Sequence, residues 1–219
     1  TSRKTFNDMH HAMYEGLRFG INAVIANHNV RQLISLHELF KKFQSHGISG
    51  QFVIAHRDEY TDNFYKLLEE NLICTFDLDK MYTDHLNKII AYLNKDDNFS
   101  SCDGGNYIVI DPDGRESCCT ALSQEKSLVM TPDEIKKPCL DPECKSCKYS
   151  YLCDGGCRYE RYNAFGDKWR YHKLESTCKV VRIYNDTIEK WLSSLDSFER
   201  KRLLETIQRY KSYLHDYYS

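Results

Sequence analysis

The chain has 219 residues, of which 41% are hydrophobic and 28% are charged, and its formal net charge is −2. These values are ordinary for a soluble globular protein, and the length suits one large domain or two small ones. The nearly neutral charge provides no basic field for nucleic acid or an anionic membrane, and no apolar run approaches the ~20 residues of a membrane-spanning helix. We therefore expect neither nucleic acid nor a membrane as a partner.

The first residues, TSRKTFNDMHHAM, do not resemble a signal peptide, because no apolar stretch is followed by small residues at a cleavage site. The missing initiator methionine indicates a trimmed or excised segment of a longer protein. His10 and His11 in this stretch are expected to lie on a solvated helix.

Residues 1–95 alternate between helical and strand periodicity. Two short, β-branched apolar runs predict buried parallel strands at 21–26 and 51–55. Apolar residues at helical spacing predict helices at 6–17, 30–43, 60–68 and 81–93. This order of βα units implies a parallel sheet with right-handed crossovers. Two strands cannot form such a sheet with both faces covered, so the pattern predicts part of a larger α/β barrel.

The second half of the chain has a different character. A polar stretch at 94–105 predicts a domain boundary, and YIVIDPDGRESCC at 107–119 predicts a hairpin with Pro and Gly in its turn. Residues 121–178 are expected to be rich in loops, and such a segment normally needs metal as its core. Apolar spacing after 180 predicts C-terminal helices. We thus expect an α/β (α+β) fold with three parts, at 1–95, 96–180 and 181–219.

Nine of the ten cysteines lie in this second half, and four fall within the fourteen residues CKSCKYSYLCDGGC, at 144–157. Disulfide frameworks usually belong to small secreted domains that lack a core, so metal is the favoured interpretation. Zinc takes four thiolates and an iron–sulfur cluster also takes four, so these four cysteines alone leave both groups open. Gly155 and Gly156 allow the backbone to bend around a bulky group.

Three more cysteines and one glycine complete a longer pattern. Cys102 is followed by eleven residues, Gly114, four residues and Cys119, and Cys178 follows the close group after a gap. This C-x(9–15)-G-x4-C, gap, C-x2-C-x5-C-x3-C, gap, C pattern resembles the SPASM domain, the C-terminal extension of many radical SAM enzymes that modify peptides and proteins. The resemblance covers residues 102–180. In pattern and order, the preceding βα units resemble the second half of a radical SAM partial barrel.

The resemblance implies two auxiliary 4Fe–4S clusters. One would be held by Cys144, Cys147, Cys153 and Cys178. The other would be held by Cys102, Cys119 and Cys157, with Cys118 or Cys139 as a possible fourth ligand, or with an open iron. Oxygen-sensitive clusters imply a reducing cytoplasm. Structural zinc bound by the same cysteines is the alternative cofactor.

Some of the remaining positions have plainer interpretations. Cys118 should point to the face of the strand opposite to Cys119, which favours a spacer over a ligand. Cys139, directly after Pro138, fits a ligand and a structural residue equally well. Cys74 is expected to be a buried small hydrophobe.

The resemblance also implies a C-x3-C-x2-C motif, which holds the cluster that cleaves S-adenosylmethionine, and this chain lacks it. Only Cys153 and Cys157 are four residues apart, and Glu160 stands three residues later. S-adenosylmethionine is therefore expected only in the intact enzyme. Polar residues at the ends of the two predicted strands could keep part of its site, although such residues usually cap loops. These residues are Asn27, Asn29, His56 and Arg57.

The sequence therefore predicts the C-terminal part of a radical SAM maturase, which depends on a separate N-terminal radical SAM half and acts on a peptide or protein substrate. Its auxiliary clusters would transfer electrons or anchor the substrate. Two alternatives stay open. One is a non-catalytic module that presents a peptide to another enzyme, and the other is a zinc-stabilised interaction domain.

Overall fold

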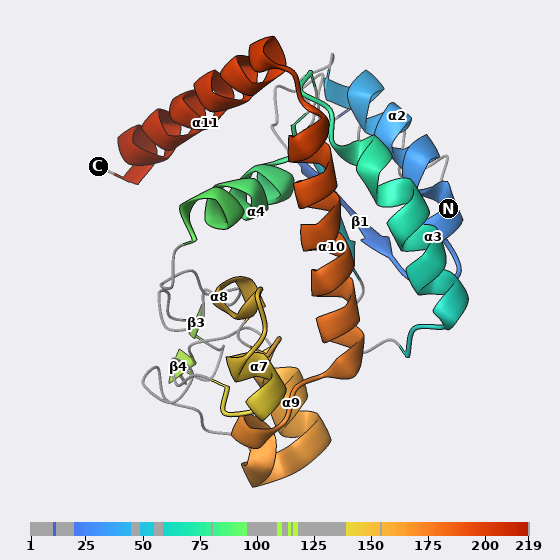
Figure 1. The fold of residues 1–219 in the computed structure, drawn as a ribbon, viewed down its shortest axis with the longest axis vertical. Helices are drawn as coiled ribbons and strands as arrows, with labels where there is room; N and C mark the ends of the chain where they lie inside the picture. The colour runs from blue at the N-terminus through green and yellow to red at the C-terminus, as the bar shows by residue number, and fades with distance from the viewer. Residues whose placement is uncertain are drawn as a thin grey trace. The chain divides into compact units, whose positions relative to one another are not determined.

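The computed structural model describes most of the chain. The described residues are 11, 20–44, 49–54, 59–79, 81–95, 109–110, 114, 116–117, 139–153 and 155–218. They are mostly helical, with one two-stranded parallel sheet and one two-stranded antiparallel hairpin (Figure 1). The chain forms two compact units, the first comprising 1–87 with 190–219 and the second comprising 88–189. His11 is helical and exposed, as predicted.

The first unit contains the predicted parallel sheet. Strand β1 (Gly20–Ile25) pairs with β2 (Ser49–Ile54), and Ala23 lies opposite Phe52. The helices at 30–43, 60–68 and 81–93 are also confirmed, with bounds close to those expected. They are η1 (Val30–Gln32), α2 (Leu33–Gln44), α3 (Asp62–Leu72), η2 (Ile73–Thr75) and α4 (Thr83–Asn94). The α2 and α3 helices lie side by side (Figure 1), and α2 contacts β2.

One face of this sheet is covered and the other is not, which corrects the prediction of fully buried strands. Along β1 the exposure alternates, so that Ile25 is 0% exposed while its neighbour Val24 is 53% exposed. On the covered face the Phe40 ring of α2 packs 5.2 Å from the Phe52 ring of β2. Because strand side chains alternate between faces, a single helical layer buries only every second residue.

Buried polar groups in the first unit bond to one another. The Tyr82 hydroxyl and His37 Nδ1 share a hydrogen bond of 2.6 Å. The Thr75 hydroxyl donates to the Leu72 carbonyl oxygen at 2.7 Å and lies 2.8 Å from His85 Nε2. The four residues whose side chains form these hydrogen bonds are at most 2% exposed, and the bonds offset the cost of desolvating their polar groups. The four residues are His37, Thr75, Tyr82 and His85.

Cys74 is exposed, so the prediction that it is a buried hydrophobe is wrong. It lies in the short η2 turn, where the neighbouring Thr75 is 0% exposed and takes the inward position. A similar exchange occurs in α2, where His37 is buried while Ile34 and Leu39 are 41% and 37% exposed. In both places a polar residue with an internal hydrogen-bond partner occupies the core in place of an apolar one.

The second unit is built from short elements. The predicted hairpin is confirmed by β3 (Val109–Ile110) and β4 (Glu116–Ser117), and Gly114 between them has a φ of 81°. The described residues of 121–178, expected to be loop-rich, instead form successive short helices. These are α7 (Pro142–Lys145), α8 (Ser150–Cys153), α9 (Arg158–Phe165) and η3 (Gly166–Tyr171).

Two long helices end the chain, as predicted. They are α10 (Glu175–Ser194) and α11 (Ser197–Tyr218). The α10 helix begins at Glu175, so the expected boundary after residue 180 falls inside a helix. The start of α11 is fixed by a reciprocal pair, in which the Glu199 N–H donates to Asp196 Oδ1 at 2.8 Å and the Asp196 N–H donates to Glu199 Oε2 at 3.0 Å.

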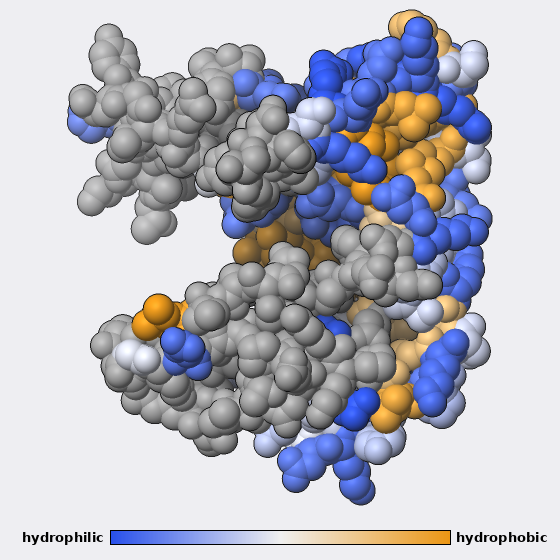
Figure 2. All heavy atoms as spheres, turned by 90° about the vertical axis from the view of Figure 1, so that its left-hand side faces the viewer, coloured by the Kyte–Doolittle hydropathy of each residue, from blue (hydrophilic) through white to orange (hydrophobic). Residues whose placement is uncertain are grey.

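Some large apolar side chains of the described residues are exposed, among them Val24 and Leu204. Figure 2 shows one face of the molecule, on which hydrophobic patches of the described residues are bordered by hydrophilic side chains. None of the helices in the described ranges combines the length and the apolar character needed to cross a bilayer.

Candidate metal centre formed by four cysteines

Helix α7 positions the first two thiols. The Asp141 side chain caps it by accepting a hydrogen bond from the Glu143 N–H at 2.9 Å, and Pro142 occupies the first helical position. After one turn the Cys147 N–H donates to the Cys144 carbonyl oxygen at 3.2 Å. This tight turn explains how two thiols three residues apart come to face the same space.

The other two thiols come from α8 and α10. Helix α8 ends at Cys153, whose carbonyl oxygen accepts from the Gly156 N–H at 3.0 Å. Cys178 lies in the first turn of α10, and its N–H donates to the Leu174 carbonyl oxygen at 2.8 Å. Residues 25 positions apart in sequence are thereby brought to one site.

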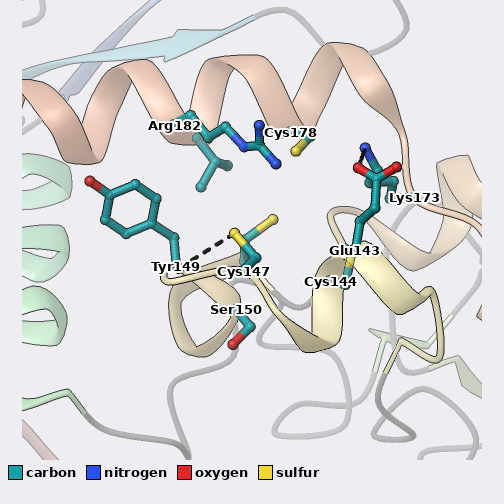
Figure 3. Close-up of a pocket in the computed structure, with 11 residues that line it drawn as sticks. Glu143, Cys144, Cys147, Tyr149, Ser150, Lys173, Cys178 and Arg182 are labelled. Atoms are coloured by element: carbon teal, nitrogen blue, oxygen red, sulfur yellow. Dashed lines mark hydrogen bonds and ion pairs between the residues drawn. The ribbon is translucent and has the colours of Figure 1, made fainter.

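All four of these cysteines line one pocket, which we call the thiol pocket (Figure 3). It contains about 370 Å³ of empty space, part of it open to solvent. Cys178 and Arg182 reach into it from α10, opposite Cys147 (Figure 3). The rest of the wall combines apolar and charged side chains. Its other lining residues are Glu143, Tyr149, Ser150, Gly155, Lys173, Val181 and Arg182.

Gly155 forms a wall of the thiol pocket that has no room for a side chain. Its φ is +78°, in the left-handed region that favours glycine. A Cβ at this position would lie 2.7 Å from the Cys139 sulfur and 3.0 Å from Arg161 Nη1. The two glycines of CDGGC thus permit close packing behind the pocket, in agreement with the sequence-based expectation that the backbone bends here.

Burial raises the thiol pKa values in the thiol pocket. It raises the pKa of Cys153 to about 11, although hydrogen bonds from the Gly155 and Gly156 N–H groups act in the opposite direction. Burial also raises the pKa of Cys178, against the lowering effect of the Arg182 and Lys173 charges. For Cys144 the pKa is raised by burial and then by the charge and hydrogen bond of Cys139. A metal group that binds here must therefore displace protons.

Two cations stand at the edge of the thiol pocket. The Lys173 side chain is 8% exposed and pairs with Glu143 at 2.8 Å and with Glu175. The pKa of Arg182 is raised, chiefly by the charge of Cys178 and also by Cys147. Positive charge next to several thiols stabilises their deprotonated form. Sequence reasoning did not identify either cation, although both are near neighbours of Cys178 in the sequence, because their approach to the other thiols is set only in the folded chain.

Tyr149 links the cysteine loop to α10. Its N–H donates to the Cys147 sulfur at 3.5 Å (Figure 3), and its hydroxyl donates to Asp186 Oδ1 at 2.5 Å. Lys148 lies 4.5 Å from the centre of the Tyr149 ring and pairs with Asp186 at 3.3 Å. Tyr149 therefore joins these two segments and also supplies a hydrogen bond to sulfur.

Two other predicted ligands, Cys139 and Cys157, do not line the thiol pocket. Cys139 is 6% exposed and donates to the Arg170 carbonyl oxygen at 3.6 Å, behind the pocket wall and next to Cys144. Cys157 is half-buried at the start of α9 and does not line the thiol pocket. The remaining predicted site residues lie outside the described residues. They are Cys102, Cys118, Cys119, His56 and Arg57.

The asparagines at the end of β1 bind neighbouring loop atoms. Asn29 Oδ1 accepts from the Ala26 N–H at 2.8 Å, and its Nδ2 donates to the Val24 carbonyl oxygen at 2.8 Å. Asn27 Nδ2 donates to the Glu59 carbonyl oxygen at 2.9 Å, and its Oδ1 accepts from the Thr61 N–H at 3.0 Å. Both amides therefore act in the loop, and their part in a cofactor site stays a prediction.

Within the described ranges, no three His, Cys, Asp or Glu side chains are arranged to hold a single metal ion. The four thiols share the pocket without closing on one point. Comparison with family models, curated proteins and solved structures finds no match to this chain.

Proposed function

We propose that Cys144, Cys147, Cys153 and Cys178 bind a 4Fe–4S cluster, and that the chain is the C-terminal part of a radical SAM maturase acting on a peptide or protein. The observation that supports this proposal is that these four cysteines, which the resemblance assigns to one cluster, line one pocket. Four thiolates are the ligand set that such a cluster takes.

The surroundings of the thiol pocket suit a group with negative charge. Gly155 keeps the wall free of a side chain, and the N–H of Tyr149 donates to a ligand sulfur. The Gly155 and Gly156 N–H groups act on Cys153 in the same way. Lys173 and Arg182 add positive charge. When bound, the cluster would supply one-electron transfer, at a potential set by hydrogen bonds to sulfur, burial and charge.

The remaining parts of the proposal concern the intact enzyme. Cys102, Cys119 and Cys157 would hold a second cluster, with Cys118 or Cys139 as a possible fourth ligand. S-adenosylmethionine cleavage would take place in the separate N-terminal half. The clusters of this chain would then accept an electron from the substrate radical made there, or anchor the substrate, in a reducing cytoplasm.

The test is the content of iron, acid-labile sulfide and zinc per chain, measured on protein purified without oxygen. We expect about eight iron and eight sulfide, the sum of two clusters with four of each. Four of each would support the thiol pocket and remove the second cluster from the proposal. One or two zinc with no sulfide would overturn the redox role and favour the zinc-stabilised interaction domain.

A further inference from the structure

Arg161 is a charged residue in the interior of the second unit. Its side chain is 0% exposed, and it projects from α9 one turn after Cys157. In the described part of the chain, its Nε, Nη1 and Nη2 atoms have no hydrogen-bond partner. A buried guanidinium without an anionic partner is strongly unfavourable, so its position calls for negative charge nearby.

The guanidinium lies directly behind the thiol pocket. Its Nη1 is 3.0 Å from the point where a Gly155 Cβ would stand, and the Cys139 sulfur is 2.7 Å from the same point. Nη1 and this sulfur are therefore within about 6 Å of each other. Gly155 lines the pocket and Cys139 bonds to Cys144. Arg161 therefore lies against the Gly155 backbone, on the side where the Cys139 thiol also packs.

Among the described residues, the neighbours of the guanidinium hold it in place without neutralising it. Its central carbon lies 5.0 Å from the centre of the Trp169 ring, and Trp169 is itself 7% exposed. The Arg161 N–H donates to the Cys157 carbonyl oxygen at 3.0 Å, which fixes the first turn of α9. A ring face attracts a cation but leaves its full charge in the interior.

We infer that Arg161 is a positioning residue for the thiol pocket, whose buried positive charge compensates the negative charge of the bound cluster and raises its reduction potential. The inference rests on the proposed function. A cluster with four thiolate ligands carries net negative charge, and reduction adds more, so a fixed cation nearby favours the reduced form. Gly155 allows the Arg161 guanidinium to come this close to the pocket because glycine has no side chain.

The first test is a redox titration, followed by electron paramagnetic resonance, on the reconstituted full chain. The relevant signal is the one that Cys153→Ala abolishes. In Arg161→Met we expect the reduction equilibrium of the cluster to shift at least about tenfold toward the oxidised form. This shift lowers the reduction potential by ~59 mV for a one-electron step. Arg161→Lys keeps the charge and should shift it less. Arg31→Met, at an exposed arginine of the first unit, should leave it unchanged.

A second measurement keeps the inference testable if Arg161→Met fails to load with iron. Removing an uncompensated buried charge should raise the thermal unfolding midpoint of the metal-free chain, while the same change should speed loss of the cluster to a chelator. If Arg161→Met lowered the unfolding midpoint by the same amount in the metal-free chain and in the cluster-loaded chain, Arg161 would have a purely structural role. That result would overturn the inference.

The two levels of the proposal fail in different ways. Wild-type protein without acid-labile sulfide would overturn the proposed function and this inference with it. Wild-type protein with intact clusters, whose potential is the same in Arg161→Met, would overturn the inference alone.

Discussion

The two units differ in how completely the described residues pair their buried polar groups. In the first unit His37 bonds to Tyr82 and Thr75 bonds to His85, so these interior polar groups are satisfied by other side chains of the same unit. In the second unit four thiols face a pocket, and the guanidinium of Arg161 has no hydrogen-bond partner among the described residues.

Under the proposed function, this difference indicates where a non-protein component would bind. A unit whose polar groups are already paired gains nothing from an added ligand, because its desolvation costs are met internally. A unit with clustered thiols and an unbalanced buried cation is completed by a group that is bound by sulfur and carries negative charge. The first unit is therefore expected to fold on its own contacts, and the second to depend on the proposed cluster.

The largest expected effect that tests this comparison is the loss of one ligand. Cys153→Ala should remove about four iron and four sulfide per chain, because a cluster takes four thiolates. The matched control is Cys74→Ala, which changes an exposed cysteine of the first unit and should leave iron and sulfide unchanged. Equal losses in both variants, measured after anaerobic reconstitution, would contradict the assignment of the pocket.

The next effect concerns the pocket wall. Gly155→Ala and Gly114→Ala introduce a side chain at nearly the same φ, +78° and +81°, which costs both variants about 1–2 kcal/mol. A Cβ at 155 would also meet Cys139 and Arg161, whereas at 114 nothing lies within 4 Å. Overpacking should make Gly155→Ala less stable by a further ~1–3 kcal/mol in urea unfolding. Equal free energies of unfolding for the two variants would show that the wall is not tightly packed.

A smaller effect is expected from the polar pairs of the first unit. Tyr82→Phe removes the hydrogen bond to the buried His37, and should lower the free energy of unfolding by about 1–3 kcal/mol without changing the iron content. Tyr171→Phe, at a residue that is 58% exposed, should have almost no effect on either quantity. Loss of iron in Tyr82→Phe would show that iron binding in the second unit depends on the hydrogen bond between Tyr82 and His37 in the first unit.

The smallest effect should depend on pH. Burial raises the pKa of Asp77, but a hydrogen bond from Lys41, the Asp79 N–H and the charges of Lys41 and His37 outweigh it, so the pKa is lowered. The stability that this carboxylate contributes is therefore present above its unfolded pKa, near 3.9, and is lost as the pH falls through the lower folded value. Asp77→Asn should be less stable than wild type at pH 7 by under ~1 kcal/mol.

The difference between Asp77→Asn and wild type should shrink as the pH is lowered below about 4. Lys41→Met removes the 2.8 Å partner of Asp77 and should reproduce the same trend. Thermal unfolding midpoints measured from pH 3 to pH 7 test both variants. A difference that grows on acidification would show that Asp77 is not stabilised as a carboxylate.

Much of the architecture could be predicted from local sequence. The β-branched runs at 21–26 and 51–55 correspond to β1 and β2, and the turn at Gly114 joins the two strands of the hairpin. These features depend on hydrophobic periodicity and turn residues within short segments, and both can be read from the sequence alone. The spacing of Cys144, Cys147 and Cys153 likewise predicted thiols that share one pocket, because short turns limit how far apart they can lie.

Other features depended on which surfaces the folded chain covers. Local pattern could not show that Val24 is exposed while Ile25 is buried, or that Thr75 rather than Cys74 takes the interior position, because periodicity does not specify the presence of a neighbouring layer.

The sequence alone determined the close spacing of Cys144, Cys147 and Cys153 and the positions of strands β1 and β2, since both are encoded by spacing between near neighbours. Tertiary structure alone placed Arg161 behind Gly155, and it brought Lys173 and Arg182, which are near Cys178 in the sequence, to the same pocket as Cys144 and Cys147. Charge compensation acts through space, and the distances that govern it exist only after segments distant in the chain have packed together.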